Sequence, residues 1–530
     1  MKWRNERVKK LRGSLVLMLI MAMCIQLVPM NVFASEPMEE LANKTGYLPL
    51  ELEEVELTDE DVADAYTLEE QEQIGATYQA GVSSYESRYY YYQLSDSKKA
   101  LYDSMYYQCN QYLSTQQDAT TYNSSYGRTD YIECTGFSKD DLMEVVYLFT
   151  ISNPQFYFVR GTAAMTGTQG SRSFVALAIY ADYISGSARA NYTAQFMNKV
   201  NNWLNTINAQ GSEYKKIKAA HDIVCANVTY DNGSNIDKHQ SSATAVLTGN
   251  TVCAGYSQMF SLLCNAAGIE TVCVTSPEHE WNEVYLYGGW YVVDCTWDDL
   301  DTSNSWDYTY FCKSESAIDE GYHEPEAYIV AYRPGCYVDY IGKVSSYNGN
   351  TFYREPDESI RCYNKNGALI TNKFMFDGSY TYYMQADGSA MTDRLTYHPD
   401  GVHIIYFDTY GHEVFNNFQY CPSVGYTCYF DSQGYIYKDV ITFANNAVYY
   451  LDANGKMQNS GWFQFANGVD YGFANWDGTL NTSGFSYDPW GRIVFYHWNG
   501  MVARGLITDG AYYYSMDTTD GHYLGSFPVN

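Results

Sequence analysis

Apolar residues recur at helical spacing in several stretches of the first half of the chain. The clearest stretch is 252–267, where Tyr256, Phe260 and Leu263 fall on one face and Gly268 follows as a stop signal. The same spacing predicts four further helices, at 95–116, from 138 onward, at 188–209 and at 213–228.

Short runs of aromatic and β-branched residues predict strands. Two of these runs, 280–287 and 290–296, flank Gly288-Gly289, a pair typical of a two-residue hairpin turn. Two more runs lie at 155–159 and 174–180. Because helices and strands both occur, we expect an α+β fold in this part of the chain.

The last third of the chain follows a different pattern. Beyond about Gly349 helical spacing disappears, and each repeat has an aromatic pair, a polar turn ending in Gly and then an apolar residue. This period predicts a solenoid of tandem β-hairpins, each too small to be stable alone and stacked on its neighbours. The recurring glycines, 21 to 23 residues apart, are Gly367, Gly388, Gly411, Gly434, Gly455, Gly478, Gly500 and Gly521.

Two segments at the N-terminus differ from the rest in composition. Residues 1–34 join a basic stretch to a short apolar core and end in Val32-Phe33-Ala34, so we expect a secretory signal peptide. Glu and Asp dominate residues 35–84, where self-repulsion and few apolar groups predict a disordered acidic linker. The folded part then divides into an N-terminal helical α/β unit at 85–210, a second domain at 211–345 and the repeats at 346–530.

Charge and motifs exclude several classes of function. The formal net charge of −30 disfavours binding to the negatively charged phosphate backbone of nucleic acids, so we expect no nucleic-acid partner. Phosphate-binding loops and zinc-like Cys/His spacings do not occur, so no cofactor or metal is expected, and no apolar stretch after the leader is long enough to span a membrane. Most cysteines are expected to be buried thiols. Candidate pairs are Cys421 with Cys428, or members of the set Cys264, Cys273, Cys295 and Cys312.

The 252–267 helix and the hairpin after it carry the residue types of a thiol acyl-transfer site. Cys253 lies in the first helical turn, where unpaired amides and the helix dipole favour a thiolate and can stabilise an oxyanion. His279 begins the hairpin and Asp294 lies near its end. An imidazole can take the thiol proton, and a carboxylate on its other nitrogen fixes the tautomer.

The strand register leaves the choice of carboxylate open. An ideal turn at Gly288-Gly289 sets Asp294 opposite Glu283, roughly 13 Å along the strand from His279. A displaced turn or a β-bulge would bring Asp294 closer. Otherwise Asp298, which the ideal register sets opposite His279, is the alternative partner.

Other residues with reactive or aromatic side chains are given structural roles. His221 and Asp222 are adjacent on a helix and point about 100° apart, so we do not expect them to form a site. His323 is also expected to be structural. Three tryptophans could line an acyl groove, but packing in the hairpin core is the preferred role of Trp281, Trp290 and Trp297.

The central motifs resemble a known family. The order VCAGYSQMFSLLCNAAGI and then HEWNEVYLYGGWYVVDCTWDD is similar to the core of the transglutaminase-like superfamily, whose members share a papain-related Cys-His-Asp site. Flanking segments extend the resemblance over about residues 211–325. It implies a cysteine-protease-like domain with Cys253 as nucleophile, His279 as base and Asp294 as the orienting acid.

The chain departs from this family at a few positions. Glu280 stands where small residues are frequent, and Cys295 stands where proline is usual. No glutamine matches the oxyanion donor of papain-type enzymes, so that donor is left unassigned beyond the backbone.

The repeats resemble the choline-binding and glucan-binding repeats that tether exported bacterial proteins to the cell surface. The resemblance implies binding to a surface polysaccharide or teichoic acid, because stacked rings suit sugar faces and quaternary ammonium groups. The alternative is a rigid stalk whose aromatic residues only hold the hairpins together. Tryptophan is confined to the later repeats, at Trp462, Trp476, Trp490 and Trp498.

These features together predict a secreted, cell-wall-associated bacterial enzyme acting on a peptide or protein substrate. Its cysteine would form a thioester and pass the acyl group to water, as a peptidase or amidase does, or to an amine, as a transglutaminase does. The alternative is a non-catalytic adaptor that binds peptide and wall polymer through the same domains.

Overall fold

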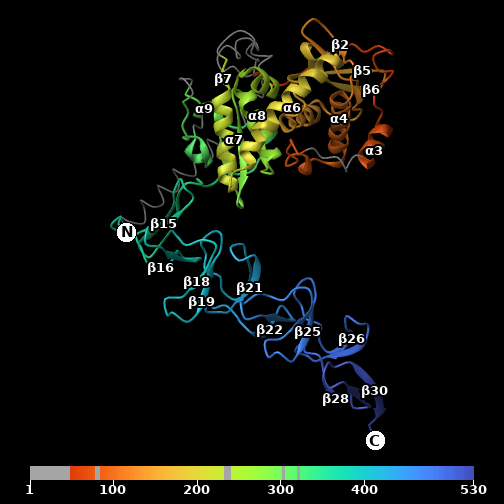
Figure 1. The fold of residues 1–530 in the computed structure, drawn as a ribbon. Helices are drawn as coiled ribbons and strands as arrows, with labels where there is room; N and C mark the ends of the chain where they lie inside the picture. The colour runs from red at the N-terminus through yellow and green to blue at the C-terminus, as the bar shows by residue number, and fades with distance from the viewer. Residues whose placement is uncertain (1–47, 78–83, 232–239, 301–304, 319–322, 530) are drawn as a thin grey trace, which may run out of the picture. The chain divides into compact units, whose positions relative to one another are not determined.

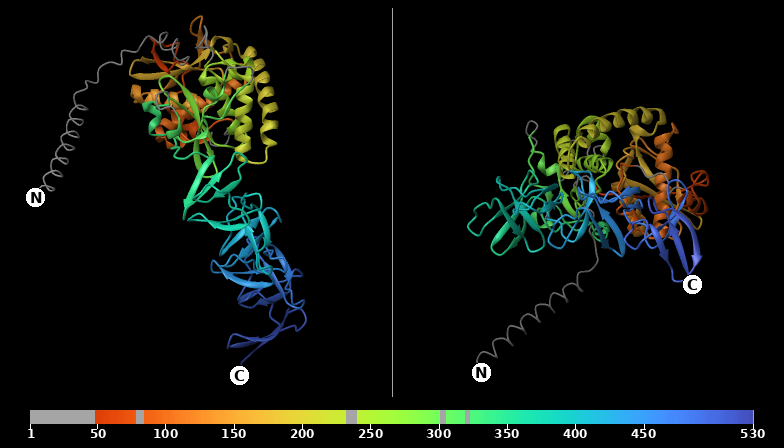
Figure 2. Two further views of the ribbon diagram at one scale, coloured as in Figure 1. Left: turned by 90° about the vertical axis from the view of Figure 1, so that its left-hand side faces the viewer. Right: turned by 60° about the horizontal axis from the view of Figure 1, so that its bottom comes forward.

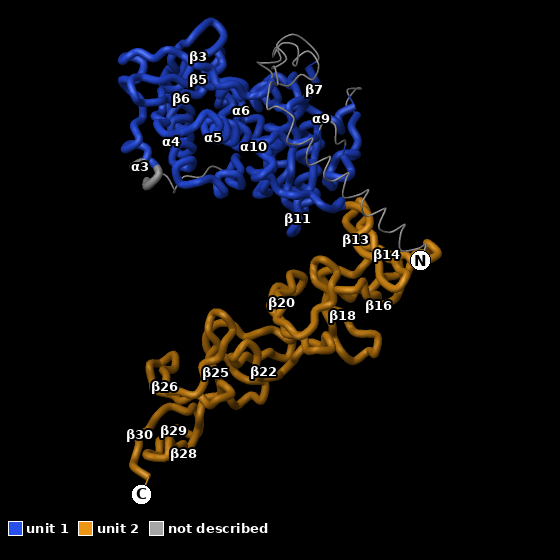
Figure 3. Tube along the Cα trace, turned by 180° about the vertical axis from the view of Figure 1, so that it is seen from behind, with its two compact units in different colours: residues 1–340 blue, residues 341–530 orange. Residues whose placement is uncertain are grey.

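The computed structural model describes residues 48–77, 84–231, 240–300, 305–318 and 323–529. The chain divides into two compact units, residues 1–340 and 341–530 (Figure 3). The predicted signal peptide lies outside the described residues, whereas the stretches expected as separate units at 85–210 and 211–345 lie together in the first unit. Across the part of the chain that is described, no helix combines the length and the apolar character needed to cross a bilayer.

One sheet of the first unit is built from residues before 181. β1 pairs in parallel with β5, and the other pairings are antiparallel. Its strands follow the order β1 (Glu51–Glu54), β5 (Val159–Gln169), β6 (Arg172–Tyr180), β3 (Tyr126–Arg128) and β2 (Thr120–Thr121), with β4 (Ile132–Glu133) also paired to β6.

The acidic segment contributes to this sheet. The disorder predicted for 35–84 is therefore wrong for much of its described part, which contains β1 and α3 (Leu68–Thr77). The acidic composition hides an alternation of buried leucines at Leu48, Leu50 and Leu52 that is typical of a strand. Burial of this apolar face offsets the repulsion between the exposed carboxylates.

The helices of the first unit begin and end close to their predicted limits. Ser95 and Ser138 cap α4 (Asp96–Ser114) and α5 (Lys139–Ser152), each accepting a hydrogen bond from a first-turn N–H. The strand predicted at 155–159 is wrong, because the chain turns there and β5 begins only at Val159. That run is apolar because it is buried in the core.

A second sheet and three long helices form the rest of the first unit. α6 (Gly186–Asn208), α7 (Glu213–Asn227) and α8 (Cys253–Ala266) lie side by side, and α8 also packs against β9 and β10 (Figure 1). The second sheet is antiparallel, in the order β12 (Phe311–Lys313), β11 (Gly289–Val293), β10 (Glu280–Leu286) and β9 (Thr271–Thr275). Shorter elements are β7 (Thr229–Tyr230), β8 (Asn250–Thr251), α9 (Cys295–Asp298) and α10 (Ala327–Val330), with a π-helical turn at Thr244–Thr248 and 3₁₀ turns at Tyr91–Gln93, Ala181–Tyr183 and Glu315–Ala317.

The hairpin of the second sheet turns one residue earlier than predicted. Leu286 pairs with Gly289, so Tyr287 and Gly288 form the turn, with φ of 47° and 90°. Positive φ at both central residues is typical of a type I′ turn. The tyrosine is held there by tertiary contacts: its hydroxyl accepts a hydrogen bond from Glu213 N at 3.2 Å, and its ring packs near Tyr340.

The second unit is a succession of hairpins, as predicted (Figure 2). Most are two-stranded, and a third strand joins the first and the last of them. The strands are β13 (Gly342–Tyr347), β14 (Asn350–Arg354), β15 (Ile360–Tyr363), β16 (Lys373–Phe376), β17 (Thr381–Met384), β18 (Arg394–Tyr397), β19 (Ile404–Phe407), β20 (Asn417–Cys421), β21 (Tyr426–Phe430), β22 (Val440–Ala444), β23 (Ala447–Leu451), β24 (Gly461–Gln464), β25 (Tyr471–Ala474), β26 (Gly484–Tyr487), β27 (Ile493–Tyr496), β28 (Gly505–Thr508), β29 (Tyr512–Met516) and β30 (Tyr523–Pro528).

The recurring glycines join each hairpin to an earlier one. Each of them has a positive φ. From Gly388 to Gly500, the second residue after each of these glycines donates its N–H to a carbonyl of an earlier hairpin. Ile436 N donates to Ile404 O and Met457 N donates to Thr427 O, following Gly434 and Gly455 respectively. Backbone bonding of this kind explains the fixed period of the sequence.

Candidate active site

Cys253 is the first residue of α8 and is completely buried. Burial raises the pKa of its thiol well above the ordinary value, and the nearby carboxyl of Glu280 raises it further. Backbone N–H groups of Glu280 and Ala254 act in the opposite direction without outweighing burial. The thiolate expected from the helix dipole is therefore not favoured in the resting protein, so the cysteine needs a base to lose its proton.

His279 and Asp294 are brought together by the displaced hairpin turn. The register pairs Asn282 with Val293, which moves Asp294 two positions along its strand toward His279 relative to the ideal turn. The ring nitrogen Nε2 of His279 lies 2.6 Å from Oδ2 of Asp294, and both residues are buried. Of the two ways to close the predicted gap, the displaced turn is the one observed in this hairpin.

Asp294 also caps α9, and this fixes its carboxylate. Its Oδ1 accepts hydrogen bonds from the backbone N–H groups of Thr296 (2.9 Å) and Trp297 (3.1 Å). Burial by itself would raise the pKa of Asp294, but the charge of His279 and hydrogen bonds from His279 and His323 hold it well below the usual range. Asp294 is therefore a carboxylate, and both of its oxygen atoms accept hydrogen bonds from neighbouring groups.

A second histidine contacts the same carboxylate. His323 Nε2 lies 2.9 Å from Asp294 Oδ2, and the two imidazole rings meet edge to face at 5.3 Å between centroids. Sequence analysis gave His323 a purely structural role. Its position in the tail that resembles the superfamily was the available signal, but no spacing rule connects it to Asp294.

Aromatic rings enclose both imidazoles. The Trp281 ring lies nearly parallel to His279, at 6.1 Å between centroids, and Trp297 lies 5.1 Å from His323. The Tyr310 ring stacks on the His323 ring, at 5.9 Å between centroids. These rings exclude water from the carboxylate–imidazole pair, which strengthens its hydrogen bonds.

Asp298, the alternative partner, faces a different histidine. Its Oδ2 lies 3.1 Å from Nε2 of His221, and its Oδ1 accepts a hydrogen bond from the backbone N–H of Tyr310 at 2.8 Å. The other ring nitrogen of His221 lies 3.3 Å from Oδ1 of Asp222. The expectation that these two helical neighbours do not meet is thus wrong, because the aspartate bends its side chain back to the ring.

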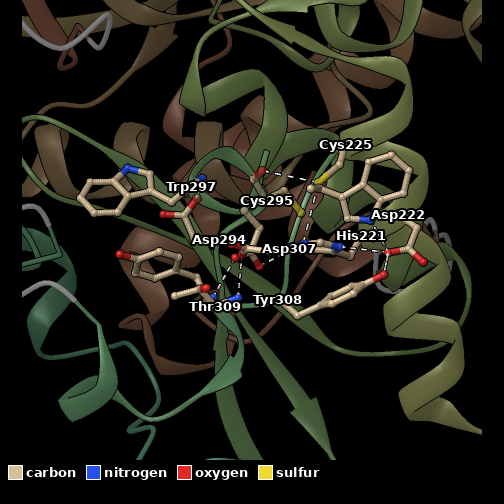
Figure 4. A network of polar contacts seen from close by, with 12 residues as sticks. His221, Asp222, Cys225, Asp294, Cys295, Trp297, Asp307, Tyr308 and Thr309 are labelled. Carbon is tan, nitrogen blue, oxygen red and sulfur yellow. Dashed lines mark hydrogen bonds and ion pairs between the residues drawn. The ribbon is translucent and has the colours of Figure 1, made fainter. Parts of the chain in front are cut away.

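The His221 network includes two cysteines. Cys225 Sγ lies 3.8 Å from His221 Nε2 and donates to the carbonyl oxygen of Cys295 at 3.5 Å (Figure 4). A hydrogen bond from the Cys295 thiol lowers the pKa of Cys225 to about 7, and His221 acts in the same direction. This network supports α9 from the side away from its cap.

Among the groups of described side chains in this domain that have the types and spacing of metal ligands, two contain a histidine. One is the site itself, with His279, Asp294 and His323, and the other is formed by His221, Cys225 and Cys295. In each group a histidine nitrogen that could bind a metal already contacts a carboxylate. A metal would have to displace those hydrogen bonds, so the geometry favours acid–base chemistry over coordination.

Comparison with known proteins assigns part of this domain to a family. Residues 201–295 match the family model of the transglutaminase-like superfamily. The chain contains a transglutaminase-like domain. Two curated relatives are kyphoscoliosis peptidases: the protein of Mus musculus is 31% identical over 117 residues and that of Homo sapiens is 29% identical over 107 residues. The alignments cover 18% and 16% of this chain and only 17% and 16% of the relatives' lengths.

Among solved structures, the chain is similar to proteins of Streptococcus pneumoniae. The choline-binding domain of CbpL is 20% identical, with 35% of this chain and 97% of that chain covered and a TM-score of 0.25. Choline binding protein F is 23% identical, with 37% of this chain and 60% of that chain covered and a TM-score of 0.25.

Proposed function

We propose that the transglutaminase-like domain catalyses thiol acyl transfer on peptide or amide bonds, with Cys253 as nucleophile, His279 as base and Asp294 as orienting acid. The observation that carries the proposal is the 2.6 Å contact between His279 Nε2 and Asp294 Oδ2. Within the described residues, the hydrogen bonds of the His279 ring involve Nε2 alone. Asp294 therefore holds the proton on Nε2 and leaves Nδ1 as the basic nitrogen.

The reaction follows from this tautomer. His279 Nδ1 takes the proton of Cys253 as the sulfur attacks the substrate carbonyl, and Asp294 stabilises the imidazolium that forms. The imidazolium returns the proton to the leaving amine, which departs as the thioester forms. Water or a second amine then attacks the thioester, with His279 again accepting the proton, and the thiol is released.

The identity of the acceptor defines the enzyme. Water makes the domain a peptidase or amidase, and an amine makes it a transglutaminase. The peptidase names of the relatives support cleavage of amide bonds in general.

The test uses the full chain and a library of glutamine-containing peptides, incubated with and without a primary amine and analysed by mass spectrometry. We expect hydrolysed or amine-linked peptides with the wild type and none with Cys253→Ala. Cys264→Ala is the matched control, because Cys264 is an equally buried cysteine of the same helix. Products that persist in Cys253→Ala, or full biological activity of that variant, would instead support the non-catalytic adaptor.

We also propose that the repeats bind a surface polymer, a polysaccharide or a teichoic acid, and that the protein acts outside the cell at the wall. Trp476, Trp490 and Trp498 are exposed on the second unit. A groove of about 680 Å³ lies beside Trp490, and its walls include Trp462, Tyr471 and Arg492. Flat rings beside hydrogen-bonding groups are the usual means of recognising sugar rings and quaternary ammonium groups.

A further inference from the structure

We infer that the side-chain amide of Gln240 is an oxyanion donor for the proposed acyl transfer, and the inference rests on that proposed function. In this role its Nε2–H group donates to the carbonyl oxygen of the substrate as Cys253 attacks. No residue of the sequence matched such a donor by family pattern. The assignment comes from the orientation of the amide, from its missing partner and from the cavity that it lines.

The orientation of the Gln240 amide is fixed by a neighbour. The backbone N–H of Leu48 donates to Oε1 of Gln240 at 2.9 Å, in the interior of the first unit. An N–H donor identifies the oxygen of an amide, so the NH₂ group of Gln240 is the other end of the side chain. The segment around Leu48 therefore positions this group, a second role for the stretch that was expected to be a linker.

The amide nitrogen has no partner in the described structure. Gln240 is 3% exposed, and its Nε2 is buried without a hydrogen bond. Leaving a buried donor unpaired costs about 1–3 kcal/mol, so such groups usually have a partner that arrives with water or substrate. A donor held in place without a partner is prepared to bind an incoming oxygen atom.

Gln240 lines a small cavity together with residues that directly follow Cys253 and His279 in the sequence. The cavity has a volume of about 20 Å³ and is also lined by Ala254 and Glu280. Ala254 directly follows Cys253, and Glu280 directly follows His279. A space of this size holds a single oxygen-sized group.

The chemistry of the cavity suits a developing negative charge. The N–H groups of Gly255 and Tyr256 already donate to Val252 O, so the backbone N–H groups of Cys253 and Ala254 provide the second donor at the start of α8. As the tetrahedral intermediate forms, the carbonyl C=O bond becomes a C–O single bond, and the electron pair moves to oxygen. Two fixed donors in a dry cavity stabilise that oxygen with little reorganisation.

Glu280 is compatible with an anion in this cavity. Its Oε1 is buried without a partner, and burial raises its pKa to about 8. Burial thus favours the neutral form of Glu280, which does not repel an oxyanion.

Two reagents separate the oxyanion role from other effects of a substitution. Acylation of Cys253 by p-nitrophenyl acetate passes through a tetrahedral oxyanion, whereas alkylation by iodoacetamide displaces iodide at a saturated carbon and forms none. Both reactions need the thiolate and access to it. We therefore expect Gln240→Ala, in the full chain, to lower the acylation rate about 100- to 1,000-fold and to leave the alkylation rate unchanged.

Gln240→Glu sharpens the test because it keeps an acceptor for Leu48 N and replaces only the NH₂ group. We expect the same selective loss of acylation in this variant. Gln108→Ala is the matched control, since Gln108 is a buried glutamine of α4 with an unpaired amide oxygen far from the site in the sequence. It should leave both rates unchanged.

Several results would overturn the inference. Unchanged acylation in Gln240→Ala would do so, and so would an equal fall in acylation and alkylation, which would indicate a general loss of structure or access. Failure of wild-type Cys253 to accept the acetyl group at all would instead overturn the proposed function and the role of Gln240 with it.

Discussion

At the scale of single residues, the account depends on Asp294. Four hydrogen bonds converge on its carboxylate, two from the start of α9 and two from the histidines His279 and His323. Such a group keeps its negative charge and holds the His279 ring in one orientation. Neutral substitutes of the same shape should therefore impair chemistry more than folding.

Asp294→Asn and Asp298→Asn form an informative pair. We expect Asp294→Asn to lower the rate of Cys253 acylation by about 10³–10⁴-fold, because an amide can donate to Nε2 and select the wrong tautomer. Asp298→Asn should change this rate far less, because Asp298 contacts His221. Stopped-flow acylation with p-nitrophenyl acetate measures both. A larger loss in Asp298→Asn would show that the wrong carboxylate has been assigned.

Glu280 predicts a pH dependence of stability. Its pKa rises from an ordinary 4.5 to about 8 in the folded protein because of burial, so folding takes up a proton between those values. The contribution of Glu280 to the free energy of unfolding is therefore greatest at low pH. It falls as the pH rises from about 4.5 to about 8, and it stays constant above pH 8.

Glu280→Gln should remove this contribution. The Tm of the variant relative to the wild type should increase between about pH 5 and about pH 8, as measured by calorimetry. Glu278→Gln, at a less buried position in the bend before β10, should show no such trend. A constant Tm difference between Glu280→Gln and the wild type would contradict a raised pKa.

At the scale of elements, the sequence predicted most helices and the repeated hairpins. The N-cap residues Ser95 and Ser138 indicated where α4 and α5 begin, because capping is a local interaction. Elements that depend on distant contacts were missed. β1 pairs with β5, which lies far away in the sequence. The many acidic residues around β1 made the alternation of its buried leucines hard to recognise.

The same reasoning applies to the candidate site. Residue type and order were enough to propose Cys253, His279 and Asp294 as a site, but not to show which carboxylate contacts His279. That contact depends on a turn at Tyr287 and Gly288. The preference of such turns for glycine had predicted the turn one residue later, at Gly288-Gly289. His323 was missed because only tertiary structure brings it to Asp294, and the same holds for the proposed role of Gln240.

The repeats give a test at this scale. An added Cβ at Gly455 would lie 2.4 Å from Cδ1 of Ile436, and the residue has a φ of 79°. We expect Gly455→Ala to lower the free energy of unfolding by more than the roughly 1–2 kcal/mol of left-handed strain alone. Gly425→Ala is the control, because its φ is 78° and nothing lies within 4 Å of its Cβ.

Chemical denaturation followed by tyrosine and tryptophan fluorescence can measure both variants. The difference between them isolates the contact between one glycine and the hairpin before it. Equal losses would contradict close packing of the recurring glycines against earlier repeats.

At the scale of the whole molecule, the two units divide the proposed work. The first unit contains the buried site proposed for acyl transfer, and the second presents aromatic rings to solvent along a series of hairpins. Exposed aromatic rings that line a groove often mark a binding surface. The stalk alternative has no need of them.

Binding of purified wall polysaccharide and teichoic acid distinguishes these alternatives. We expect Trp490→Ala to reduce co-sedimentation with at least one of these polymers by about tenfold, because one stacked ring contributes on the order of 1 kcal/mol or more. Tyr397→Ala, an exposed aromatic residue outside the groove, should bind like the wild type. Wild-type protein that binds neither polymer would favour the stalk.

The location of the acyl group is the most direct test of the central claim. The full-length protein is mixed with p-nitrophenyl acetate, quenched in acid and mapped by peptide mass spectrometry. The account predicts an acetyl group on Cys253 in the wild type and none there in His279→Ala. Acetylation at another residue, or equal acetylation of Cys253 without His279, would contradict it.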